Sequence, residues 1–373
     1  MKLAGVAVCV VCLSVSAFLC ISDQLEVSRH AVSVGAPFQV TIPIGLIDPD
    51  VPRFNPLTRE KILLGRRLFL DKSLSRDRET SCAFCHNPST AFADKREFSK
   101  TAKGTQTSRN TPSVLNSGYL TVVGWEGYFH SLEAQVANSF THSGDMSIDI
   151  DEAVSRIETN ADYQRMFFVA FGGPPNADRL TQAIASYERS LVSGNSRVDQ
   201  YLFGRKEDAL NDLEREGYLL FTDKAACINC HDVFHPDLNP LGGRIATFMD
   251  NRFHNLGVGY ANGQMKDVGR YEVTRDPEDW GAFKTPGLRN VALTPPYMHD
   301  GSLATLKEVV EFYNQGCIKN PNLSPGLRPL YLTKHEKSAL VAFLGALTDP
   351  QLDRYAEEAN DSSNSHLSPE PSK

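Results

Sequence analysis

Residues 82–86 read Cys-Ala-Phe-Cys-His and residues 227–231 read Cys-Ile-Asn-Cys-His, so the chain carries one five-residue pattern twice. Cys-x-x-Cys-His is the attachment pattern of a c-type haem, in which the thiols bond the haem and the histidine binds its iron. A zinc site would need its ligands in one cluster, whereas these pairs begin 145 residues apart (227 minus 82). The pattern therefore predicts two covalently bound haem c groups, held by Cys82, Cys85 and His86 and by Cys227, Cys230 and His231.

The composition of the chain is that of a globular protein. The 373 residues are 41% hydrophobic and 22% charged, and this length suits two domains of ordinary size. A net charge of −7 gives no basic surface for nucleic acid. We therefore expect no nucleic-acid partner.

Residues 1–22 predict an export signal. Lys2 precedes an apolar run that ends where the polar stretch begins at Ser22. Haem c is attached outside the cytoplasm, so both signals predict a periplasmic protein. The run is about long enough to span a bilayer, which leaves a retained N-terminal anchor as the alternative. Removing the signal leaves the four cysteines of the two motifs and Cys317, hence no partner for a structural disulfide.

The rest of the chain predicts a mainly α fold. Apolar residues recur at helical spacing in several stretches, and no strand pattern is sustained. We expect a leader over 23–55 lying on the first domain, domains over 56–200 and 201–350, and a disordered tail over 351–373. We expect Ser302 to cap the helix that begins at 304. The predicted helices are 58–69, 132–139, 150–171, 180–192, 207–221, 304–313 and 333–347.

The amino-acid sequence around the two motifs resembles that of the bacterial di-haem cytochrome c peroxidases and their MauG-like relatives. The resemblance covers about residues 55–350 and lies in RNTPSVLN at 109–116, WEG at 125–127, FHN at 253–255, TPGLRNV at 285–291 and TPPYMHDG at 294–301. It implies two cytochrome c-like haem domains packed around an inter-haem junction. The first domain would be peroxidatic and the second would transfer electrons.

The haem on His86 is expected to have one open side. Many di-haem peroxidases block that side with a second histidine in the loop that follows the motif, but this chain has neither His nor Met between His86 and His130. In lacking this histidine, the chain resembles the MauG-like branch of the family. The alternative is that His130 or His142 reaches the iron as a second ligand.

Two residues of this chain match the acid and amide that the family places on the peroxide side. They stand ten and twenty residues after Trp125, at Gln135 and Asp145. Cleavage of peroxide needs a group that takes a proton from one oxygen and returns it to the other. The family acid is usually Glu, so Asp145 is one methylene shorter and would work through a water, and His142 could share the proton. The alternative is that Asp145 caps the helix beginning near 150.

The haem on His231 resembles the six-coordinate electron-transfer haem of the family. Its second ligand lies seventeen residues after Pro296, which gives Tyr313; MauG has Tyr there and the peroxidases have Met. A phenolate would favour ferric iron and the storage of oxidising equivalents. Met298 is the rival ligand, and on periodicity alone Tyr313 is a core aromatic.

The resemblance also implies a bridge between the haems. Trp125 matches the inter-haem Trp, a large oxidisable ring. Asn110, Thr294 and Pro296 match positions that bind a calcium ion through one side chain and two carbonyls, and oxygen ligands suit this hard cation.

Three functions remain open from the sequence. The first is a MauG-like oxidase that uses hydrogen peroxide to oxidise a Trp or Tyr of a partner protein. The second is a periplasmic cytochrome c peroxidase that reduces hydrogen peroxide with electrons from a small cytochrome or copper protein. The third is a non-catalytic electron carrier, which would need both irons six-coordinate.

Overall fold

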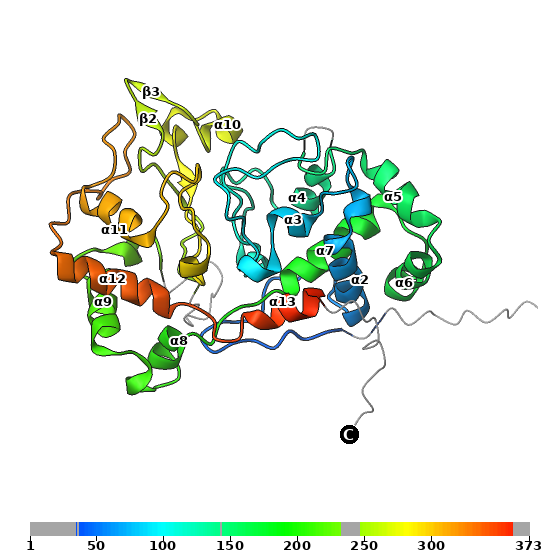
Figure 1. Ribbon diagram of the computed structural model, residues 1–373, viewed down its shortest axis with the longest axis horizontal. Helices are drawn as coiled ribbons and strands as arrows, with labels where there is room; N and C mark the ends of the chain where they lie inside the picture. The colour runs from blue at the N-terminus through cyan, green and yellow to red at the C-terminus, as the bar shows by residue number, and fades with distance from the viewer. Residues whose placement is uncertain (1–34, 36, 142–143, 233–246, 361–373) are drawn as a thin grey trace, which may run out of the picture.

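The computed structural model describes residues 35, 37–141, 144–232 and 247–360, and these form two mainly helical halves side by side (Figure 1). The export signal predicted over 1–22 lies outside the described residues. The helices are α2 Arg59–Leu70, α3 Cys82–Cys85, α4 Leu132–Ser139, α5 Ile150–Glu158, α6 Ala161–Phe171, α7 Ala177–Ser190, α8 Arg197–Leu202, α9 Asp212–Thr222, α10 Tyr271–Thr274, α11 Leu306–Asn314, α12 Lys334–Ala346 and α13 Asp353–Asn360.

Strands are few in the described part of the chain. They form two antiparallel pairs of two residues each. In the first pair, β1 Phe253–His254 lies beside β4 Phe283–Lys284, and in the second, β2 Tyr260–Ala261 lies beside β3 Gln264–Met265. The prediction of a mainly α fold is therefore confirmed.

Each half is built on one close crossing of two helices. In the first half α2 packs on α7, and in the second half α9 packs on α12. A glycine lies at each crossing: a Cβ on Gly65 would collide with the carbonyl of Ala183, and a Cβ on Gly217 would collide with that of Ala339. In both halves the helix that carries the glycine is the one that leads to a Cys-x-x-Cys-His motif. The halves thus repeat one architecture.

Each crossing lies within its own hydrophobic core. Leu64, Leu68, Phe69 and Tyr187 belong to the first core. Phe221, Phe248, Leu340 and Phe343 belong to the second. Burial of such side chains contributes roughly 1.5–3 kcal/mol each, so each haem motif is attached to a rigid core.

Several boundaries differ from the prediction. The helix expected over 150–171 is broken after Glu158, because Asn160 accepts hydrogen bonds from the backbone N–H groups of Asp162 and Tyr163 and caps α6. Thr305, not Ser302, caps α11 and forms a capping box with Glu308.

The predicted disordered tail over 351–373 was wrong for residues 353–360, which form α13. Leu352 and Tyr355 are buried in the core of the first half, and the Tyr355 hydroxyl donates to the carbonyl of Val192 at 2.8 Å. Residues 361–373 lie outside the described part. The second half therefore ends in a segment that returns to the first.

The leader expected over 23–55 touches both halves. Its residues before 35 and residue 36 are not described. The Tyr119 hydroxyl, in the first half, donates to the carbonyl of Ile47 at 2.6 Å. Leu46 and Ile47 pack on a small cluster that includes Met249 of the second half. The expectation that the leader lies on the first domain alone was too narrow.

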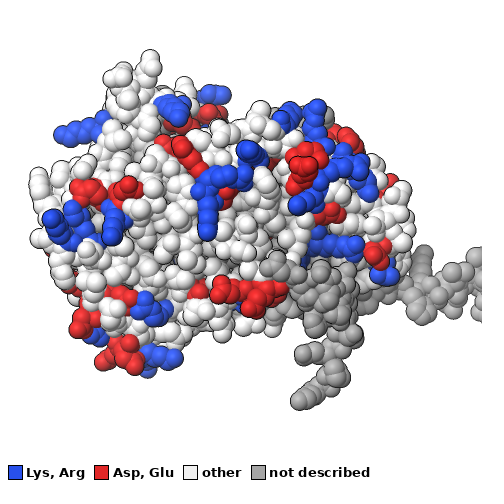
Figure 2. Space-filling model, in the orientation of Figure 1, with Lys and Arg blue, Asp and Glu red and all other residues white. Residues whose placement is uncertain are grey.

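The surface carries charges of both signs. Figure 2 shows Lys and Arg interspersed with Asp and Glu over one face, without one sign dominating it. Among the described residues, no helix combines the length and apolarity that crossing a membrane requires.

Candidate active site

Both attachment motifs lie on single turns of helix that follow the crossing helices. The backbone N–H of His86 donates to the carbonyl of Cys82 at 2.9 Å, and that of His231 donates to the carbonyl of Cys227 at 2.9 Å. Each turn therefore brings its cysteine pair and its histidine together.

The two histidines are held in the same way. His86 Nδ1 lies 3.2 Å from the carbonyl oxygen of Phe92, and His231 Nδ1 lies 3.0 Å from that of Phe248. A carbonyl can only accept, so each Nδ1 carries the proton and each Nε2 keeps its lone pair. Burial also lowers the pKa of both, to about 4 for His231. Both rings are therefore neutral and oriented as iron ligands are.

A continuous cavity of about 1330 Å³ joins the two motifs. His86, Cys227, Cys230 and His231 line it, and Cys82 and Cys85 line a smaller pocket that His86 shares. A single ligand pocket usually has about 300–1,000 Å³. The buried ammonium of Lys284 also lines the cavity, and burial lowers its pKa to about 8. A large cavity lined by fixed imidazoles, by thiols and by buried cationic side chains such as Lys284 fits haem groups, whose propionates are anionic.

Gln135 and Asp145 lie together beside the first motif. Both line the cavity and also the smaller pocket of about 30 Å³, whose lining includes His86, Cys82 and Cys85. Gln135 projects from α4 and donates to the Ser139 hydroxyl at 3.1 Å. Burial raises the pKa of Asp145. The structure therefore brings a buried acid and an amide together in a pocket beside His86.

The alternative that Asp145 caps a helix is wrong. The N-cap of α5 is Asp149, whose carboxylate accepts from the backbone N–H of Asp151 at 2.9 Å.

His130 is a poor candidate for a second ligand of the first haem. Its side chain is exposed, and it lines neither the cavity nor the smaller pocket. His142, the other candidate, lies outside the described residues.

Tyr313 and Met298 both line the cavity. Tyr313 projects from α11. Burial raises its pKa, and charge on the sulfurs of Cys317, Cys227 and Cys230 would raise it further, so the phenol lies near the attachment cysteines. Met298 lies in a turn with positive φ (71°) between Tyr297 and His299.

Trp125 lies at the junction between the halves. Its indole N–H donates to the carbonyl of Asn110 at 2.8 Å, and its own carbonyl accepts from the N–H of Lys284 at 2.8 Å. The ring packs edge-on against His299 at 6.5 Å, and His299 stacks on Phe283 at 3.6 Å. Sequence reasoning did not single out His299 or Phe283, although His299 stands within the motif at 294–301.

The three positions matched to calcium also line the cavity. The side-chain NH₂ of Asn110 donates to the carbonyls of Arg96 and Glu97 at 3.0 and 3.1 Å. Because both neighbours are acceptors, the amide oxygen points the other way and is the atom a cation would use. The resemblance would add the backbone carbonyls of Thr294 and Pro296, and oxygen donors of this kind suit a hard cation.

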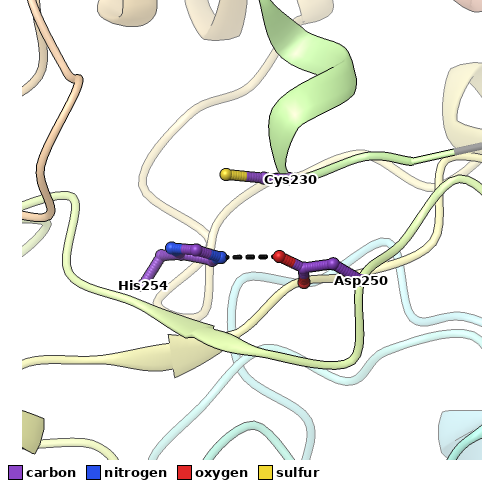
Figure 3. Close-up of side chains that lie close together, drawn as sticks. All are labelled: Cys230, Asp250 and His254. Atoms are coloured by element: carbon purple, nitrogen blue, oxygen red, sulfur yellow. Dashed lines mark hydrogen bonds and ion pairs between the residues drawn. The ribbon is translucent and has the colours of Figure 1, made fainter. Parts of the chain in front are cut away.

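Cys230, Asp250 and His254 form a cluster with metal-ligand spacing, their nearest ligand atoms all within 4.8 Å of one another (Figure 3). His254 Nε2 lies 2.8 Å from the Asp250 carboxylate. Cys230 is one of the cysteines that bond haem, and a thioether is a weak metal ligand. We therefore interpret the cluster as an ion pair beside the second haem and not as a metal centre.

Comparison with known proteins agrees with this geometry. Residues 59–207 match the family model of the di-haem cytochrome c peroxidases. The chain is 37% identical to the methylamine utilization protein MauG of Methylorubrum extorquens, over 81% of this chain and 84% of the relative. It is 32% identical to the cytochrome c551 peroxidase of Nitrosomonas europaea, over 89% and 94%.

A solved structure shows the same fold. The crystal structure of a MauG-like protein associated with microbial copper homeostasis superposes with a TM-score of 0.74 and 34% identity, over 84% of this chain and 97% of that one. The two attachment motifs, the shared cavity and these relatives lead to one conclusion: the chain belongs to the di-haem cytochrome c peroxidase and MauG family and is a di-haem oxidoreductase that acts on peroxide.

Proposed function

We propose that the protein is a MauG-like oxidase that uses hydrogen peroxide to remove electrons from a Trp or Tyr of a partner protein. Trp and Tyr are the side chains that lose electrons most readily. When bound, the haems supply an iron that reacts with peroxide and a second iron that stores and relays electrons. Cys82, Cys85 and His86 would hold the first haem, and Cys227, Cys230, His231 and Tyr313 the second.

The residues beside the first haem would handle the proton. Asp145 would take a proton from one peroxide oxygen and return it to the other, and Gln135 would orient the peroxide through its amide. A pKa raised by burial suits this task, because a carboxyl must be able to hold the proton as well as release it. Trp125 would carry electrons across the junction.

One observation favours this proposal over the electron carrier: among the described residues, no second histidine lines the small pocket that His86 shares with Gln135 and Asp145. His130 is exposed and away from the cavity, and no His or Met stands between His86 and His130. The placement of Tyr313 near the second motif adds support. A pure electron carrier would need a second ligand on each iron.

Reduction of peroxide by a small cytochrome c or copper protein is the second candidate. Several relatives carry the name cytochrome c peroxidase, among them that of Nitrosomonas europaea. We further propose that the protein is periplasmic, that Asn110, Thr294 and Pro296 bind Ca²⁺, and that the inter-haem junction depends on it.

Electron paramagnetic resonance of the resting ferric protein tests the proposal. We expect one high-spin signal from the haem on His86 and one low-spin signal from the haem on His231. Two low-spin signals would contradict an open first haem. Tyr313→Phe should change the low-spin signal, and Met298→Leu, the matched control, should leave it unchanged. The opposite result would assign the ligand to Met298.

Turnover separates the two enzymatic candidates. Steady consumption of peroxide with reduced small cytochrome c or copper protein as donor would favour the peroxidase. Slow donor turnover, with peroxide instead consumed by oxidation of Trp or Tyr in a partner, would favour the oxidase.

A further inference from the structure

Glu188 is a buried acid that no proposed role so far uses. It lies near the end of α7, with 5% of its surface exposed. No hydrogen bond or ion pair to its carboxyl is found among the described residues. Its neighbour Arg189 is engaged elsewhere, with both terminal nitrogens on the Glu133 carboxylate at 3.2 and 3.3 Å. Burying a carboxyl without such partners costs free energy, so a buried Glu at this position needs a functional explanation.

The Glu188 side chain faces the same space as Asp145 and Gln135. All three line the large cavity, and all three line the smaller pocket together with Cys82. That pocket has about 30 Å³, which is room for about one water molecule. A water there would have two carboxyls and an amide as hydrogen-bond partners.

The charges around Glu188 are few. Burial is the largest effect on Glu188 and raises its pKa to about 8. The charge of Arg189, on the same helix, lowers this pKa, whereas the charge of Glu133, on α4, raises it. Cys82 and Cys85 on α3, His86 and Asp145 line the same small pocket as Glu188, and thioether formation removes the charge of both cysteines. Glu188 can therefore hold a proton at neutral pH and release it slightly above.

We propose that Glu188 is a second proton-holding residue of the His86 haem pocket, exchanging a proton with Asp145 through a water. This inference rests on the proposed assignment of that pocket as the peroxide side. Asp145 is one methylene shorter than the usual family acid, and Glu188 makes up for its shorter reach. Asp145 and Glu188 would move a proton from one peroxide oxygen to the other, so that the outer oxygen could leave as water when the O–O bond breaks. The bound haems would supply the two electrons for this reduction, and the inner oxygen would stay at the His86 haem.

Glu188→Gln tests the role, because it keeps the shape and removes the proton. We expect the reaction of the ferric protein with hydrogen peroxide, followed by stopped flow, to slow about tenfold and to lose its pH dependence near 8. Glu188→Asp, which keeps a carboxyl, should recover much of the rate. Asp145→Asn should slow the reaction by about 10²-fold.

Cyanide binding gives a readout that does not depend on turnover. Hydrogen cyanide binds ferric iron as the anion, so a nearby base must hold its proton. We expect Glu188→Gln to shift the pH dependence of cyanide affinity while the thermal midpoint changes little. If only Asp145→Asn alters rate and cyanide binding, the role of Glu188 is overturned but the pocket assignment stands. If neither variant alters them, the pocket assignment itself fails.

Infrared spectroscopy covers the case in which Glu188→Gln does not fold. In the wild-type ferric protein a carboxylic-acid C=O band should persist at neutral pH and disappear as the pH rises through about 8. Absence of any such band would overturn the proposal.

Discussion

At the residue scale, the Asp250–His254 pair makes stability depend on pH. The hydrogen bond to Asp250 is the largest cause that raises the pKa of His254, to about 9. The Asp250 pKa falls to about 2, since the hydrogen bond from His254 and the N–H of Arg252 outweigh its burial. Cys230 adds to the rise for His254 through its thiol, a contribution that thioether formation removes. The pKa of His254 is still raised without that contribution, because the hydrogen bond to Asp250 is the larger cause.

The sign of the effect follows from these directions. His254 has a folded pKa above its unfolded value of 6.5, so its contribution to stability is complete below about pH 6.5 and is lost as the pH rises through about 9. Asp250→Asn keeps the shape and removes the charge. We expect it to cost about 1–3 kcal/mol of unfolding free energy at pH 6, and much less at pH 10. Urea denaturation at both pH values measures this; an equal loss at both would contradict it.

At the element scale, the two glycines at the helix crossings decide how closely each pair of helices packs. A Cβ on Gly65 would meet the Ala183 carbonyl and, at 2.9 Å, the Cβ of Tyr187; a Cβ on Gly217 would meet the Ala339 carbonyl and, at 2.7 Å, the Cβ of Phe343. Backbone cannot yield as a side-chain end can. Gly65→Ala and Gly217→Ala should each destabilise the protein by about 1–3 kcal/mol, although alanine favours helix by about 1 kcal/mol.

Gly345→Ala is the matched control for both variants. Gly345 also lies within a helix, α12, but no atom of the described part of the chain stands within 4 Å of an added Cβ. It should be neutral or stabilise by up to about 1 kcal/mol. Thermal unfolding followed by circular dichroism compares the three, and a Gly217→Ala protein as stable as Gly345→Ala would show that the crossing is not tight.

How far the sequence predicts each element depends on where its signal lies. The haem motifs, and the helix at 132–139, carry local signals, and the structure places them as expected. The break at Asn160 was missed because apolar spacing continues across it, while the cap depends on one side chain. α13 was missed because its polar sequence gives no sign of the core that Leu352 and Tyr355 join. In a sequence, a Glu next to an Arg is typical of a solvent-exposed charged pair. Only the fold shows that Arg189 forms its ion pair with Glu133 and not with Glu188.

At the scale of the whole molecule, ionic and polar contacts hold the two halves together around the shared cavity. Arg109 of the first half binds Asp267 of the second through two nitrogens at 2.7 and 2.9 Å, and also Glu272 at 3.1 Å and Glu126 at 2.6 Å. In return, Arg270 of the second half donates to the carbonyls of Glu126 and Gly127. The junction that holds Trp125 therefore lies inside a set of contacts that crosses both ways.

Arg109→Lys tests whether the bonding geometry of the Arg109 guanidinium stabilises the junction in addition to its charge. Arg109 is 15% exposed, and lysine keeps the charge but cannot form the two parallel bonds to Asp267. We expect a loss of about 1–2 kcal/mol in unfolding free energy and slower electron exchange between the haems, because the halves that position Trp125 are held less firmly. Arg165→Lys is the control: Arg165 is 72% exposed and, among the described residues, forms an ion pair only with Asp162 of its own helix, so its change should stay within about 0.5 kcal/mol. Urea denaturation and the rate at which the two haems equilibrate after partial reduction measure both effects. Equal stability and equal rates in the two variants would mean that the positive charge at residue 109 is sufficient, and that the two parallel hydrogen bonds to Asp267 do not contribute to joining the halves.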